Sequence, residues 1–166
     1  MNREKEFSTI INTISSEENI LLGKINFRSN DEVFISVDNV IEFEDEVFLI
    51  EIDSSNQAKL VAGQYALLCF LFKNPIKKND YFKSIIFDNK KKITFFVVHC
   101  YKNYNRERSL NNLIFLKQNL KSMIGVGTIH MDDLKRNLKN VNSKVDLLNS
   151  LKSNCYKQPN EQRVKI

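Results

Sequence analysis

The sequence predicts an α/β protein in which a central mixed β-sheet is flanked by helices. Residues 5–14 place apolar side chains at the spacing of one helix face, whereas residues 32–43 and 47–53 are runs rich in Val, Ile and Phe that have the composition of strands. Only four glycines and two prolines interrupt the 166 residues, which favours regular elements over long loops. Helical and strand-like segments therefore account for most of the chain.

The other elements follow from the same two periodicities. The first helix is expected to restart after Ser15 and to reach about Gly23. The segment 47–53 is almost entirely apolar, which predicts a central strand covered on both faces. The further elements expected, in chain order, are a short strand at 24–27, a hairpin tip at 44–46, a helix at 57–73, strands at 82–88 and 93–101 joined by a basic tip at 89–92, a helix from Ser109 to about Met123, a strand at 124–130 and a final helix from Asp132.

The apolar residues of the final helix are spaced by four, three, four and three positions: Leu134, Leu138, Val141, Val145 and Leu148. This spacing fits a coiled-coil seam that would make a homodimer, and it also fits a helix packed on its own domain. The chain from residue 152 has almost no apolar residues. We therefore expect a single domain over residues 1–151 and a polar C-terminal tail over residues 152–166.

Composition excludes several classes of protein. No apolar run reaches the ~18 residues of a membrane span, and the charged start of the chain is unlike a secretory signal, so we expect a cytoplasmic protein without a membrane partner. The three cysteines are far apart and form no CxxC pair, which indicates neither a disulfide framework nor a zinc site. His99 and His130 stand in or beside apolar strands and are interpreted as core or strand-end residues.

Charge is distributed unevenly along the chain. Residues 1–72 hold 5 basic and 13 acidic side chains, and residues 73–166 hold the other 20 basic and 7 acidic ones. An acidic half that can hold cations thus precedes a basic half that can hold a polyanion. The alternative is that the lysines of the second half only solvate the surface.

Three carboxylates are expected to meet on the hairpin. Strand alternation puts Glu51 and Asp53 on the same face as Val47 and Leu49. A hairpin loop of two or four residues pairs positions whose numbers sum to 89, which sets Asp38 opposite Glu51 with Cβ atoms roughly 4.5–5.5 Å apart. A loop of three residues would shift this register by one.

Like charges that face each other destabilise a sheet unless something compensates them. Mg²⁺ (or Mn²⁺) is suited to this role because it takes one or two carboxylates together with waters and substrate phosphate. Asp38, Glu51 and Asp53 are therefore the predicted metal ligands and, with the metal, the predicted catalytic group for hydrolysis of a phosphodiester.

Lys59 lies in the first turn of the next predicted helix, six residues after Asp53. From there its ammonium group is expected to approach the scissile phosphate or the attacking water, aided by the positive end of the helix. A lysine that faces solvent is the alternative interpretation.

These residues resemble the motif of the PD-(D/E)xK nuclease superfamily, whose fold is called restriction-endonuclease-like. Asp38 takes the place of the first aspartate and Glu51-Ile52-Asp53 that of the tripeptide, although the family usually has lysine where this chain has Asp53. Lys59 is then a candidate for a lysine that has migrated to the helix, and Gln64 resembles the helix glutamine of some members. The resemblance implies a metal-dependent endonuclease, or an inactive nucleic-acid-binding or regulatory module that has kept the fold.

Nucleic acid is the expected partner, with DNA preferred over RNA. The basic residues predicted to contact it occupy a hairpin tip and a loop with interleaved tyrosines: Lys90, Lys91, Lys92, Lys102, Arg106 and Arg108. Contacts between such side chains and phosphates are independent of base sequence, so they indicate affinity and no particular recognition sequence.

Overall fold

The computed structural model describes residues 2–14, 20–29, 32–55, 58–73, 91–103 and 105–157. The predicted strand at 82–88 and most of the basic tip at 89–92 lie outside these residues. The described elements are α1 (Arg3–Asn12), β1 (Ile25–Ser29), β2 (Glu32–Val37), β3 (Asn39–Glu42), β4 (Glu46–Asp53), α2 (Ala58–Lys73), β5 (Lys92–His99), α4 (Arg106–Asn119), β6 (Gly125–His130), α5 (Met131–Leu138) and α6 (Lys144–Lys152).

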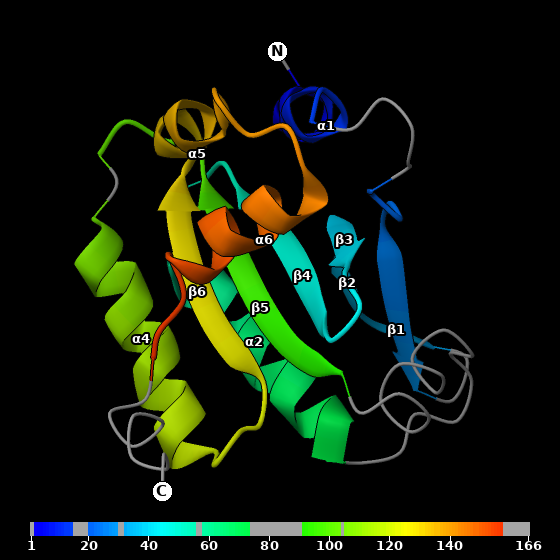
Figure 1. Ribbon diagram of the computed structural model, residues 1–166. Coiled ribbons are helices and arrows are strands. Elements are labelled where there is room, and N and C mark those ends of the chain that lie inside the picture. The colour runs from blue at the N-terminus through cyan, green and yellow to red at the C-terminus, as the bar shows by residue number, and fades with distance from the viewer. Residues whose placement is uncertain are drawn as a thin grey trace, which may run out of the picture.

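A mixed four-stranded sheet in the order β3-β4-β5-β6 forms the centre of the molecule (Figure 1). β3 runs antiparallel to β4, whereas β4, β5 and β6 are mutually parallel. β1 and β2 pair antiparallel in a separate two-stranded sheet. The prediction of an α/β protein with a mixed sheet and flanking helices is confirmed.

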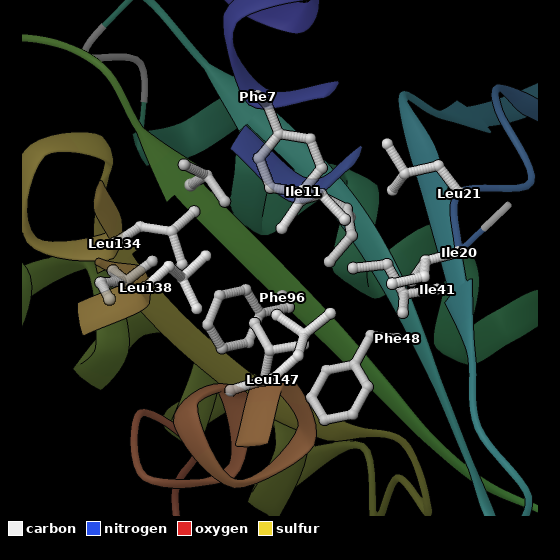
Figure 2. Packing of buried hydrophobic residues seen from close by; sticks show 14 of the residues in the cluster. Phe7, Ile11, Ile20, Leu21, Ile41, Phe48, Phe96, Leu134, Leu138 and Leu147 are labelled. Atoms are coloured by element: carbon white, nitrogen blue, oxygen red, sulfur yellow. The ribbon is translucent and has the colours of Figure 1, made fainter. Parts of the chain in front are cut away.

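Helices cover both faces of this sheet because the side chains of β4 alternate between two apolar cores. Val47 and Leu49 join a core with α2 and α4, which includes Tyr65 of α2. Phe48 and Ile50 join a second core with α1, α5 and α6. Figure 2 shows the second core, in which Phe48 and Phe96 of the sheet meet residues of α1, α5 and α6. The predicted alternation along 47–53 and the central position of this strand are confirmed.

The predicted strand at 32–43 is instead two strands that belong to different sheets. β2 ends at Val37 and β3 begins at Asn39, with a bend at Asp38 between them. The Asp38 side chain accepts a hydrogen bond from the Ile52 amide at 2.9 Å. The Asp38 carboxylate thus accepts a hydrogen bond from the β4 backbone at the point where the chain turns from β2 into β3.

The first helix, predicted over residues 5–14, is α1, which ends at Asn12. Its predicted restart is wrong at residues 20–23, which run along the edge of β3, and residues 15–19 lie outside the described ranges. Leu21 bridges Ile41, and the Gly23 amide donates to the Asn39 side chain at 2.9 Å. Gly23 has a φ of 80°, a left-handed conformation that glycine adopts without strain and that ends any helical path here.

The helix predicted to start at Ser109 begins earlier, at Arg106. Asn105 caps it by accepting a hydrogen bond from the Arg108 amide at 2.9 Å. Asparagine caps helices as well as serine does, and the prediction overlooked Asn105. Ser109 is left inside the first turn, where it is buried.

The final helix is interrupted. α5 ends at Leu138 and α6 starts at Lys144 with Ser143 as its N-cap, so no continuous seam runs from Leu134 to Leu148. Leu134 is fully buried in the second core, whereas Val145 is 66% exposed. The coiled-coil interpretation is therefore wrong, and the alternative, packing on the chain's own domain, holds for the buried members of the set.

The chain after α6 continues onto the sheet. Thr128 donates its amide to the Asn154 carbonyl at 3.2 Å, and Tyr156 donates to the Val126 carbonyl at 2.9 Å. These bonds hold residues 154–156 along the edge of β6, although the sequence predicted a polar tail from residue 152. Within the described ranges, no helix is long and apolar enough to cross a membrane.

Two substitutions test the packing of the last helices. Leu134→Ala removes a fully buried side chain and is expected to lower the free energy of unfolding by about 3 kcal/mol, whereas Val145→Ala should change it by less than about 0.5 kcal/mol. Urea unfolding followed by circular dichroism gives both values. A loss at Val145 as large as the loss at Leu134 would contradict the interrupted arrangement.

Candidate functional site

The β3–β4 hairpin has the register predicted from its sequence. Asn39 pairs with Ile50 and Glu42 with Val47, and every pair between them keeps the same sum of 89. Phe43 donates its amide to the Glu46 carbonyl at 2.8 Å, which closes a loop of two residues, Glu44 and Asp45. The pairing stops at Asn39 and Ile50, one step before Asp38 and Glu51, because Asp38 lies in the bend between β2 and β3.

Asp38 reaches across to β4. Its Oδ2 accepts the hydrogen bond from the Ile52 amide, directly after Glu51 in the strand. Its negative charge is close enough to Glu51 to raise the pKa of that carboxyl. The charge of Asp53 acts on Glu51 in the same direction, so all three predicted metal ligands lie near one another.

Glu51 is half-buried on the face covered by α2. Its Oε2 atom is buried and has no hydrogen-bond partner among the residues that the structure describes. Burial raises the pKa of the Glu51 carboxyl to about 7, against the opposing effects of the nearby Gln64 side chain and the positive charge of Lys24. An acceptor left without a donor in a buried place is costly, because it has lost water and gained nothing in return.

Asp53 is on the same face of β4 but is fully engaged. Its Oδ1 accepts from the amide and the hydroxyl of Ser55 at 3.1 and 3.3 Å, and its Oδ2 lies 2.9 Å from His99 Nδ1. Burial raises the pKa of Asp53, but the hydrogen bonds from His99 and Ser55 outweigh it and hold this pKa below its ordinary value. Asp53 is therefore a charged carboxylate satisfied by protein groups.

His99 continues this chain of hydrogen bonds to Ser109. Its Nε2 lies 2.9 Å from Ser109 Oγ, so a neutral ring that carries its proton on Nδ1 donates to Asp53 and accepts from the serine. The order Asp, His, Ser is that of a hydrolase triad. His99 is fully buried and Ser109 is 4% exposed, however, so a substrate carbonyl has no access to the hydroxyl. The three residues instead join the ends of β4 and β5 to the start of α4.

The predicted helix residues are divided by the geometry of α2. Gln64 lies close enough to Glu51 to lower the pKa of its carboxyl, whereas Lys59 is exposed in the first turn. The two residues are five positions apart, about 140° around the helix, so they do not face the same point. The basic side chain that acts on Glu51 is Lys24, which precedes β1 and is itself exposed. No motif in the sequence singled out Lys24.

The predicted nucleic-acid contacts lie at two ends of the sheet. Lys91 and Lys92 are at the start of β5, and Lys91 is paired with Glu42 at 2.7 Å. Three exposed residues, Lys102, Arg106 and Arg108, follow the end of β5, the same end of the sheet as Glu51 and Asp53. β5 spans its eight residues over roughly 26 Å, so the two groups form separate surfaces. Lys90 lies outside the described residues.

In the part of the chain that the structure describes, no group of three or more His, Cys, Asp and Glu side chains is arranged to hold a metal ion. Asp38 and Glu51 remain as a pair, because Asp53 is turned to His99. Comparisons of the chain with family models, with curated proteins and with solved structures find no match. Functional inference for this chain therefore rests on its own residues.

The raised pKa of Glu51 makes stability depend on pH. The carboxyl titrates near 4.5 when the chain is unfolded and near 7 when it is folded, so ionisation favours the unfolded chain. Without divalent cations, the free energy of unfolding should fall as pH rises from 4.5 to 7, by roughly 1–2 kcal/mol after allowance for solvent screening of the half-buried group.

Urea unfolding across this pH range measures the effect. Glu51→Gln should flatten the profile, whereas Glu44→Gln, which neutralises an exposed carboxylate at the hairpin tip, should leave it unchanged. If wild type and Glu51→Gln lose stability in parallel as pH rises, Glu51 is not the group responsible for the pH dependence.

Proposed function

We propose that this chain is a metal-dependent phosphodiesterase that cleaves DNA, with RNA as the alternative substrate, and that Asp38 and Glu51 hold its divalent cation. The observation that supports this most strongly is the buried Oε2 of Glu51, which lacks a donor and lies beside the charge of Asp38. Mg²⁺ or Mn²⁺ fits such a pair, since these ions accept one or two carboxylates and complete their shell with water and phosphate.

The order of elements supports the restriction-endonuclease-like class. A helix, a hairpin with an aspartate at its bend, a central strand with two carboxylates and a covering helix occur in the sequence expected for PD-(D/E)xK nucleases. Asp38 corresponds to the family's first aspartate and Glu51 to the first residue of its tripeptide. The position of the family lysine is Asp53, so a positive charge must come from elsewhere.

Two lysines are candidates for that charge. Lys24 acts electrostatically on Glu51, and Lys59 is exposed at the start of α2. An ammonium group beside the reacting phosphate would neutralise its developing negative charge and orient the attacking water. The bound cation would lower the pKa of that water. Gln64 is near the Glu51 carboxyl and favours its ionised form, which is the form that binds a cation.

The substrate surface is expected at the same end of the sheet. Three basic residues are exposed after the end of β5: Lys102, Arg106 and Arg108. Their positive charge is the property that would attract nucleic acid. Such side chains bind the phosphate backbone whatever the base sequence.

Incubation of supercoiled plasmid with the protein and Mg²⁺ or Mn²⁺ tests the proposal. Wild type should nick or linearise the plasmid, and Asp38→Asn or Glu51→Gln should reduce the rate at least about a hundredfold, since each removes a metal ligand. Glu44→Gln is the matched control and should retain the wild-type rate. Loss of activity in Lys24→Gln or in Lys59→Gln would identify the lysine that acts.

One observation favours a second function, that of a non-catalytic nucleic-acid-binding module. Asp53 occupies the lysine position and both of its oxygens are bound by protein groups. Such a chain would shift DNA or RNA in a gel without cutting it at any divalent cation concentration. Cleavage that depends on Glu51 would rule this alternative out. Cleavage of RNA but not of DNA would show that RNA is the substrate.

A further inference from the structure

A cavity of about 970 Å³ lies between the C-terminal ends of α2 and α4 and the starts of β5 and β6. It is at the large end of the range for small-molecule sites. None of its described lining residues is an aspartate or a glutamate. Five of them are lysines, contributed by both helices, by β5 and by the segments that flank these elements: Lys73, Lys91, Lys92, Lys117 and Lys121.

Two of the lysines are held in place by backbone carbonyls. Lys73 Nζ donates to the Leu120 carbonyl at 2.6 Å, and Lys117 Nζ donates to the Ser122 and Ile124 carbonyls at 2.9 and 3.2 Å. These bonds position the ammonium groups without neutralising them. The simplest interpretation is that they only satisfy the carbonyls at the end of α4.

Charge balance shows that helix capping explains only part of the cluster. Lys91 is neutralised by its ion pair with Glu42. Each helix C-terminus contributes about half a negative charge, so α2 and α4 together offset about one lysine. Among the described lining residues, Lys92 and Lys121 are exposed and lie outside the two helices, so they add positive charge that helix capping does not explain.

The cavity also has an apolar wall with aromatic rings. Phe72 of α2 and Tyr156 pack against the core shared by α2 and α4 and are half-buried, and Tyr156 is anchored by its bond to Val126. Ile93 and Ile124 add aliphatic surface. Lysines bind phosphate as point charges, and aromatic rings accept the flat face of a base.

This cavity is separate from the carboxylate pair. Its β5 residues, Lys92 and Ile93, are at the start of the strand, whereas Glu51 pairs with Val97 near the end. Five strand positions between Lys92 and Val97 amount to roughly 16 Å. A ligand in the cavity would therefore be bound by groups that take no part in the proposed cleavage.

We propose that this cavity is a nucleotide-binding site, in which phosphate groups meet the lysines and the base lies against Phe72 and Tyr156. The nucleotide is either free or the phosphorylated end of a nucleic-acid strand. The proposal does not depend on cleavage by Asp38 and Glu51.

Isothermal titration without divalent cations tests it with three probes: ADP, inorganic diphosphate and a short 5′-phosphorylated oligonucleotide. Wild type should bind ADP or the oligonucleotide saturably at one site, and more tightly than diphosphate because of the aromatic wall. The double substitution Lys92→Gln/Lys121→Gln should weaken this binding about tenfold, which corresponds to about 1.4 kcal/mol. Both side chains are exposed, so the fold should persist.

The matched control is Lys5→Gln/Lys139→Gln, which removes two exposed lysines, one in α1 and one directly after α5. It should bind like wild type. ADP binding that depends on Lys92 and Lys121 indicates a free nucleotide, and oligonucleotide binding alone, with the same dependence, indicates a strand end. The proposal is overturned by the absence of saturable binding, by an equal loss in both double variants, or by diphosphate binding as tightly as ADP.

Discussion

The hydrogen bond from the Ile52 amide to the Asp38 carboxylate is the interaction on which the arrangement of the site depends. It gives β4 an acceptor at the point where β3 has ended, so the buried amide is satisfied without a continuous partner strand. The chain is then free to turn into β2, which pairs with β1 in a sheet of its own. The same bond sets the Asp38 carboxylate beside Glu51.

Two carboxylates on one face of β4 have opposite environments, and this contrast defines what each can do. Asp53 receives hydrogen bonds at both oxygens from His99 and Ser55, and its pKa is lowered although it is buried. Glu51 has one buried oxygen without a donor among the described residues, and its pKa is raised. Asp53 therefore stabilises the ends of the central strands, and Glu51 is the group that a cation would stabilise. The structure thus gives different surroundings to two residues that one motif treats together.

Much of this arrangement followed from local pattern. The period of two along 47–53 predicted both faces of β4, and the hairpin register followed from the length of its loop. What failed depended on contacts distant in sequence. The bend at Asp38 arises from the Ile52 amide, and the engagement of Asp53 arises from His99, which is 46 residues away. Lys24 comes near Glu51 only in the folded chain, and no spacing between the two residues in the sequence predicts this proximity.

The proposed cation site is tested most directly by a crystal soaked in Mn²⁺ and measured near the manganese absorption edge. An anomalous peak that contacts carboxylate oxygens of both Asp38 and Glu51, at roughly 2.1–2.2 Å, is the result expected from this account. Asp53 should keep its bonds to His99 and Ser55 in the soaked crystal. A crystal with no peak at this pair, or with a peak bound by Asp53 in place of Glu51, would contradict it.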